Sequence, residues 1–177
     1  MLKVILLLIV LVVVGVLIVA ATRPDKFSVS RKIIIKASPE KIFAELNDFN
    51  RWKVWSPWEK KDPTMQRTFS GAAFGVGTVY DWNGNKNVGQ GRMEIIESTE
   101  PQKIVIKLDF FKPFTAHNIA ELSLTPVADG TLFNWEMHGP QVFMGKLMSI
   151  FCDMDKMIGT DFEEGLSNIK NLTEKAQ

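Results

Sequence analysis

The fold is decided by residues 103–138, which read KIVIKLDFFKPFTAHNIAELSLTPVADGTLFNWEMH. Apolar side chains alternate with polar ones in 103–110 and again in 131–138, which is typical of strands with one buried face. A third strand is expected over 115–125, and Asp129-Gly130 is the turn signal that follows it. Consecutive strands joined by short turns predict an antiparallel sheet.

The same kind of pattern extends toward the N-terminus. Further strands are expected at Met65–Ser70, Thr78–Asn83 and Val88–Ser98, separated by glycine-rich turns. Phe27–Lys36 is rich in β-branched residues and predicts the first strand. Ser38-Pro39 then marks a helix start, because serine is a good N-cap and proline suits the first helical position.

A long helix is predicted to follow the last strand. Its apolar stripe comprises Phe143, Leu147, Ile150, Phe151, Met154, Ile158, Phe162, Leu166, Ile169 and Leu172. Gly159 interrupts the stripe, and it indicates a kink or a close approach by another backbone. This helix is the one predicted element large enough to cover the apolar face of the sheet. The sequence therefore predicts an α+β fold, a curved antiparallel sheet around a long C-terminal helix.

The N-terminus predicts a membrane anchor. Val4–Ala21 reads VILLLIVLVVVGVLIVAA without a polar side chain, and a helix of that length spans about 27 Å, close to the thickness of a hydrocarbon core. A cleaved signal peptide is the alternative, although its apolar region is usually only about 7–15 residues long. The expected organisation is an anchor over 1–22, a linker over 23–26 and one domain over 27–175.

The side of the membrane is predicted from the flanking charges. Arg23, Lys26, Arg31 and Lys32 follow the apolar segment, whereas Lys3 precedes it. The excess of basic residues after the segment favours a cytoplasmic domain by the positive-inside rule. Arg31 and Lys32 weaken this argument, because both belong to the first expected strand.

Overall charge and cysteine content exclude other classes. The chain has 21 basic and 20 acidic residues, a net charge of +1, so no general attraction to nucleic acid is expected. Its one cysteine, Cys152, excludes an internal disulfide and is compatible with a reducing compartment.

Three stretches resemble one known superfamily. They are VSRKIIIKASPEKIFAELNDFNRWKVWSPW at 29–58, FSGAAFGVGTVYDWNGNKNVGQGRMEI at 69–95 and MDKMIGTDFEEGLSNIKNL at 154–172. Together they resemble the START-like superfamily, which includes Bet v 1 and the polyketide cyclase/dehydrase and lipid-transport proteins. The resemblance implies the helix-grip fold and, for most members, a hydrophobic ligand between sheet and helix. It transfers no catalytic residue.

Aromatic and methionine side chains are the candidates for the wall of such a cavity, because ligand pockets are mostly apolar and methionine adapts to irregular shapes. The alternative for each residue is ordinary core packing. Trp58, in the tryptophan-rich stretch 51–58, is a further candidate for the cavity mouth or a membrane interface. The predicted cavity residues are Trp52, Trp55, Trp82, Phe110, Trp135, Met137, Met144, Met148, Phe151 and Met154.

Metal and thiol chemistry find little support. His117, His138 and Cys152 lack the spacing of metal ligands, so no metal site and no cofactor are predicted. His138 is expected to face solvent. Cys152 lies in an apolar helical context without a nearby histidine, and it is interpreted as a buried, inert thiol.

Carboxylates give no clear catalytic set. Asp153 with Asp155, and the neighbouring pair at 163–164, are interpreted as solvated surface, because neither spacing puts both groups on one helical face. Asp81, Glu94 and Glu121 lie in expected strands, where an inward-facing carboxylate would be a candidate acid or base. No catalytic residue is predicted from the sequence.

Three functions remain open. The first is a membrane-tethered protein that binds a lipid or another hydrophobic small molecule, with residues 4–21 in the membrane. The second is a module of the same fold that binds a protein partner. The third, an enzyme such as a cyclase or dehydratase, requires an ionisable group inside the cavity.

Overall fold

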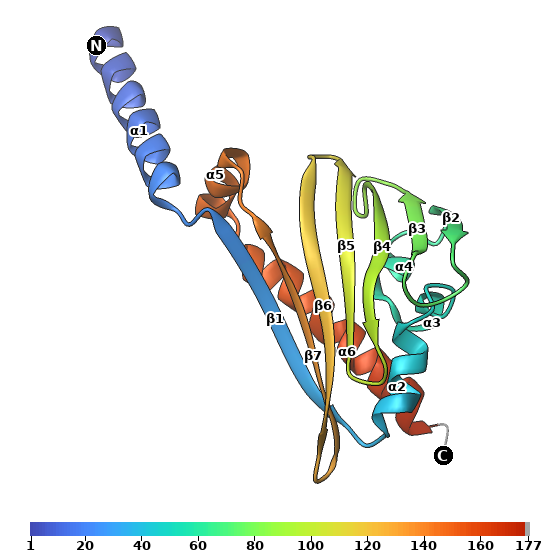
Figure 1. Cartoon of the computed structure of the whole chain (residues 1–177). Helices are drawn as coiled ribbons and strands as arrows, with labels where there is room; N and C mark the ends of the chain where they lie inside the picture. The colour runs from blue at the N-terminus through green and yellow to red at the C-terminus, as the bar shows by residue number, and fades with distance from the viewer. Residues whose placement is uncertain (176–177) are drawn as a thin grey trace.

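A single seven-stranded antiparallel sheet dominates the computed structural model of the protein, which describes residues 1–175 (Figure 1). The strand order is β1-β7-β6-β5-β4-β3-β2, so the first strand pairs with the last. The strands are β1 (Lys26–Ile35), β2 (Gln66–Gly71), β3 (Thr78–Asn83), β4 (Gln90–Thr99), β5 (Lys103–Lys112), β6 (Ala116–Val127) and β7 (Gly130–Pro140).

The described residues also form six helices, of which α6 covers one face of the sheet. They are α1 (Leu2–Thr22), α2 (Pro39–Leu46), α3 (Trp52–Trp55), α4 (Pro57–Lys61), α5 (Phe143–Phe151) and α6 (Met154–Lys175). Figure 1 shows α6 running diagonally across the sheet, and its end lies near α2. The α+β helix-grip architecture predicted from the sequence is confirmed.

The inner faces of the strands follow the predicted alternation. Phe133, Trp135 and Met137 of β7 are all buried, and so are Leu122 and Leu124 of the neighbouring β6. These side chains meet Phe162, Leu166 and Ile169 of α6 in one core. The period of two in the strands and the stripe on the helix therefore specify opposite halves of the same core.

The predicted long helix is wrong in one respect, because it is divided into α5 and α6. Cys152 has extended backbone angles (φ −127°, ψ 130°) and ends α5. The Asp153 carboxylate then accepts a hydrogen bond from the Lys156 amide at 3.0 Å, which is the N-cap contact that begins a new helix. Gly159 lies inside α6, so it does not mark the break.

The N-terminal helix α1 stands away from the sheet (Figure 1). Within residues 1–175 it is the one helix whose length and composition suit a membrane crossing, and nearly all its side chains are exposed. Its last turn is the exception, since Ala20 is completely buried and this end of α1 packs beside α5. The anchor itself stays a prediction.

Candidate functional site

The tryptophan-rich stretch forms solid core. Trp52 and Trp55 have ring centroids 4.6 Å apart, and both rings meet the edge of Trp135. Trp135 is also stacked on Phe162 of α6 at 4.4 Å, and Trp58 meets both of these rings edge to face, at 5.7 and 6.3 Å. These aromatic rings fill the space between β7 and the middle of α6.

The indole N–H groups in this core already have partners. Trp52 Nε1 donates to the Leu46 carbonyl at 3.0 Å, and Trp55 Nε1 donates to the Glu45 carbonyl at 3.3 Å. Both rings are therefore positioned by α2 as well as by one another. Three of the ten predicted cavity residues, Trp52, Trp55 and Trp135, are thus brought together as packed core.

A second group lies toward the other end of the sheet. The ring of Trp82 on β3 meets Phe110 on β5 edge to face at 5.6 Å, and its Nε1 donates to the Val88 carbonyl at 3.0 Å. Gly91 on β4 lies between them, and a Cβ there would be only 2.4 Å from the Trp82 ring. Glycine at this position lets the indole lie flat on the sheet.

Apolar side chains around Trp82 are incompletely covered. Met93, Leu108 and Phe110 share the inner face of β4 and β5, and all three are only half-buried. Met137 on β7 is buried nearby, while Met148 and Met154 are half-buried on α5 and at the start of α6. We call this end of the sheet, lined by Trp82, Leu108, Phe110, Asn118 and Met137, the open end.

Asn118 is the one amide on the inner face of β6 at the open end. It is buried beside Leu108, its cross-strand neighbour, and its Nδ2 lies 4.0 Å from Met137 Sδ. Its Oδ1 has no hydrogen-bond partner in the described part of the chain. Gly139 leaves room for this oxygen, because a Cβ there would come within 2.3 Å of it. A buried carbonyl without a partner costs about 1–3 kcal/mol, so it is an available acceptor for a ligand.

The remaining predicted cavity residues lie outside both groups. Met144 and Phe151 are on α5, where Met144 is half exposed and Phe151 is 72% exposed. Cys152 follows them and is exposed, so its interpretation as a buried thiol is wrong. The physical reason is the helix break, which turns this residue away from the core.

Open hollows flank the α5–α6 junction. One of about 490 Å³ is lined by Lys61, Cys152, Asp153, Lys156, Met157, Thr160 and Asp161. Another of about 430 Å³ is lined by Arg23 and by residues 149–155. Both are on the surface, and both place Cys152 in their walls.

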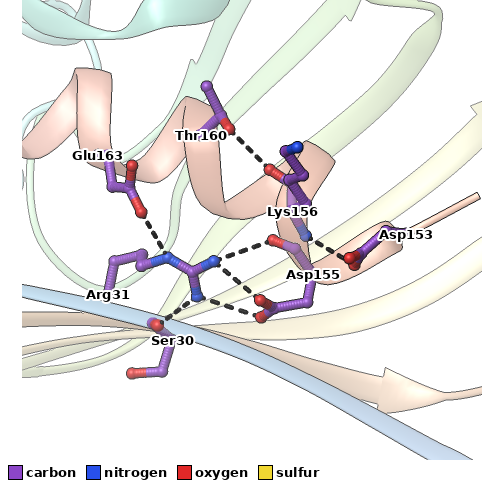
Figure 2. A network of polar contacts seen from close by, with 7 residues as sticks. All are labelled: Ser30, Arg31, Asp153, Asp155, Lys156, Thr160 and Glu163. Carbon is purple, nitrogen blue, oxygen red and sulfur yellow. Dashed lines mark hydrogen bonds and ion pairs between the residues drawn. The ribbon is translucent and has the colours of Figure 1, made fainter.

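Arg31 holds the start of α6 against the sheet (Figure 2). Its guanidinium donates to both carboxylate oxygens of Asp155, at 3.1 and 2.9 Å, and to Glu163 at 2.8 Å. It passes directly over Gly159, where a Cβ would be 2.0 Å from Arg31 Nη2. Asp155 and Glu163 are exposed on the surface, as the sequence predicts, but both are also paired with Arg31. The close approach at Gly159 is made by a side chain.

Acid is expected to weaken this contact. Hydrogen bonds from Arg31 lower the pKa of Asp155 below its ordinary value of 3.8. A lowered pKa contributes stability that is present above the ordinary value and is lost as the pH falls through the folded-state pKa. We expect Asp155→Asn to be less stable than wild type at pH 7, and the difference to shrink progressively below pH 3.8. Urea titrations across this range measure it, with Asp129→Asn in the exposed β6–β7 turn as control. A constant difference at all pH values would contradict the expectation.

Ionisable strand residues face away from the core. Asp81 pairs with Arg92 at 2.7 Å, and Glu121 pairs with His138 at 3.3 Å. Both pairs alternate with buried inner-face residues, so they lie on the outer face, as does Glu94 beside buried Ile95. The prospect of an inward acid or base at these positions is not realised.

Asp109 forms the other ion-pair cluster of the outer face. It contacts His117 Nδ1 at 2.7 Å and Lys107 Nζ at 3.0 Å. Burial by itself would raise the pKa of Asp109, but the hydrogen bonds from His117 and Lys107 lower it overall. The cluster sits across the sheet from the open end and shares no space with it.

A polar contact missed by sequence reasoning ties α4 to the sheet edge. The Tyr80 hydroxyl donates to Glu59 at 2.9 Å, and Arg67 pairs with the same carboxylate. Burial and the neighbouring Glu59 raise the pKa of Tyr80, which keeps the phenol protonated. Because Glu59 is on α4 and its partners are on β2 and β3, only the tertiary fold brings these side chains together.

Metal-binding geometry is not found among the residues described. No three His, Cys, Asp or Glu side chains between positions 1 and 175 gather in a way that would hold an ion.

Comparison with known proteins identifies the family. The family profile described as polyketide cyclase / dehydrase and lipid transport matches residues 26–174. The chain belongs to this family. Its match begins where β1 begins and ends one residue before α6 ends. The family domain therefore contains the whole sheet and the helices from α2 to α6, and α1 lies outside it.

Solved structures share the fold at low identity. A Chromobacterium violaceum protein is 13% identical with a TM-score of 0.59, covering 86% of this chain and 99% of its own. The Aha1 dimer from Colwellia psychrerythraea is 19% identical with a TM-score of 0.60, covering 84% and 96%. The di-domain ARO/CYC protein StfQ from the steffimycin biosynthetic pathway is 10% identical with a TM-score of 0.61, covering 85% of this chain and 51% of its own. No curated protein matches the sequence.

Proposed function

We propose that this family member binds a lipid or another hydrophobic small molecule at the open end, and that α1 holds it at a membrane. The half-buried inner face around Leu108 and Phe110 carries the proposal. Apolar surface in a two-layer fold is normally covered by the facing helix, and here α6 is accompanied by tryptophans only in its middle part. In this proposal the ligand covers the half-buried side chains of the open end, which the tryptophans do not reach.

Asn118 supplies the polar contact that such a site needs. Ligand pockets combine an apolar lining with a few polar groups that orient the ligand. The free Oδ1 of Asn118 accepts hydrogen bonds, so it suits a ligand with a hydroxyl or amide donor among its apolar atoms. The strand carboxylates Asp81, Glu94 and Glu121 all face outward, which favours binding over catalysis.

The proposal predicts a retained apolar molecule. The full-length chain is purified in detergent. Native mass spectrometry then shows whether a small molecule stays bound to the protein, and extraction of the protein with organic solvent identifies that molecule. We expect wild type to carry about one apolar molecule per chain. Leu108→Trp should lose at least about 80% of it, because the larger ring occupies the inner face beside Asn118.

Lipid bound around α1 is the main source of error, and matched variants separate it. Val54→Trp adds the same ring at an exposed position on α3 and should retain the ligand. Both variants keep α1, so lipid around that helix contributes equally. Equal retention in wild type, Leu108→Trp and Val54→Trp would show that only α1 carries lipid and would overturn the proposal.

A further inference from the structure

The end of the sheet that faces α1 is set by strand register. Lys26 at the start of β1 pairs with Pro140 at the end of β7, and β7 ends beside the start of β6. Ala116 at the start of β6 in turn pairs with Phe110 near the end of β5. The β5–β6 turn therefore lies at the same end of the sheet as the linker to α1, and Figure 1 shows these features at similar height.

α5 is fixed at this end. The buried Lys146 side chain reaches the carboxylate of Asp25 in the linker after α1, and the Gln141 amide donates to the Asp25 carbonyl at 2.8 Å. The last turn of α1 packs on α5 with Ala20 completely buried. The position of α5 is thus tied to the point at which α1 leaves the domain.

Large apolar side chains are exposed at this end. Phe143 and Met144 of α5 are half exposed, and Phe151 at its end is more so. Phe111 and Phe114, at the β5–β6 turn, are exposed as well. We call these five side chains together with Val142 the phenylalanine surface.

We propose that the phenylalanine surface rests on the bilayer that α1 enters, with α5 lying in the interface. The inference rests on the membrane anchoring in the proposed function. α5 has nine residues, which is about half the length needed to span a bilayer, and its exposed apolar side with a buried polar anchor suits an interfacial helix.

Continuity with α1 is what favours lipid as the occupant. A helix in contact with the last turn of a membrane span lies at the depth of the headgroups. Arg23 directly follows α1, Lys26 begins β1, and Lys112 follows Phe111 at the end of β5. Basic side chains near the membrane surface attract anionic lipid. Aromatic side chains are also favoured at the boundary between headgroups and acyl chains.

Docking in this way would turn the open end toward the lipid. Phe111 and Phe114 are exposed at the β5–β6 turn, where they would contact the lipid. The neighbouring Phe110 faces inward and lines the open end. A ligand would then pass between the bilayer and the inner face of the sheet without crossing bulk water. This deepens the proposed function by naming the source of its ligand.

The single cysteine allows a direct test. Cys152 is exposed and follows Phe151. The full-length protein is labelled there with a nitrobenzoxadiazole fluorophore and placed in vesicles of phosphatidylcholine and phosphatidylglycerol that contain a doxyl-labelled lipid. We expect the spin label to reduce emission by about half, because interfacial helices lie roughly 5–10 Å into the headgroup and acyl boundary.

Two variants make the result specific. Replacing both Phe143 and Phe151 with serine, which removes exposed side chains, should abolish at least about two thirds of the quenching. A label at Val127→Cys in a Cys152→Ser background reports the β6–β7 hairpin at the opposite end and should stay unquenched. Equal quenching at both label positions, or undiminished quenching in the double serine variant, would overturn docking through this surface.

Membrane anchoring is measured separately on the same vesicles. Flotation after an alkaline wash shows whether α1 is inserted. Insertion with an unquenched Cys152 label refutes the docking surface and leaves the anchor and ligand site standing. Failure of the protein to float refutes the anchor, and the docking proposal with it, while ligand retention by the detergent-purified chain still tests the open end.

Discussion

Replacing Trp135 with alanine should lower the free energy of unfolding by about 3–5 kcal/mol, the range found for large aromatic side chains removed from cores. Trp135 is 3% exposed and meets the rings of Trp52, Trp55, Trp58 and Phe162. Removing it leaves a cavity between β7 and α6 that these rings cannot close together. Urea unfolding followed by circular dichroism of the detergent-solubilised full chain gives the value.

Val54→Ala is the matched control for this prediction, because Val54 is exposed on the neighbouring α3. A change within about 0.5 kcal/mol is expected there. The ligand assay adds a second readout. If Trp135 belongs to the packed core and not to the ligand site, the folded fraction of Trp135→Ala should still retain the ligand. A loss of stability below about 1 kcal/mol would mean that the tryptophans line a cavity and are not closely packed.

Most of the fold could be predicted from local patterns in the sequence. Alternation in Thr131–His138 placed Phe133, Trp135 and Met137 on the inner face, because a strand's side-chain period depends only on its own backbone. Turn signals such as Asp129-Gly130 set the order of antiparallel neighbours for the same reason. The family resemblance implied the same arrangement, the helix-grip fold, and the family match over residues 26–174 agrees with it.

The difference between cavity wall and core could not be predicted in this way. Trp52 and Trp82 look alike as predicted cavity residues, yet the first is enclosed by aromatic rings and the second lies beside half-buried neighbours. What decides each case is the side chain that faces it from a distant element, such as Phe162. Sequence periodicity fixes which face a residue occupies, but not how fully that face is covered.

The position of Arg31 was equally hidden, because its partners lie 124 and 132 residues away. A cation beside β-branched residues reads as a solvated strand residue unless the opposing helix is known. Gly159 was the available signal. A glycine within a helix costs about 1 kcal/mol relative to alanine, so its presence indicates a close approach, and the guanidinium is the group that approaches.

Gly159→Ala tests this arrangement, because its effect on the free energy of unfolding should be destabilising when Arg31 is present and stabilising when Arg31 is absent. With Arg31 present, the new methyl group meets the guanidinium, and overpacking of this kind costs about 1–3 kcal/mol. In an Arg31→Ala background the space is empty, and alanine's better helix propensity should then stabilise the protein by up to about 1 kcal/mol. Urea unfolding of the wild type, both single variants and the double variant measures the coupling.

Gly145→Ala is the control within the other helix of the junction, because its Cβ would meet only a flexible Gln141 side chain at 3.4 Å. We expect it to be neutral or slightly stabilising in both backgrounds. If Gly159→Ala also stabilises the protein that contains Arg31, the guanidinium does not lie over α6 as Figure 2 shows. Asp155 and Glu163 would then be free of it, and the first half of α6 would be held by its apolar side chains and by the ion pairs Lys60–Glu164 and Lys61–Asp161.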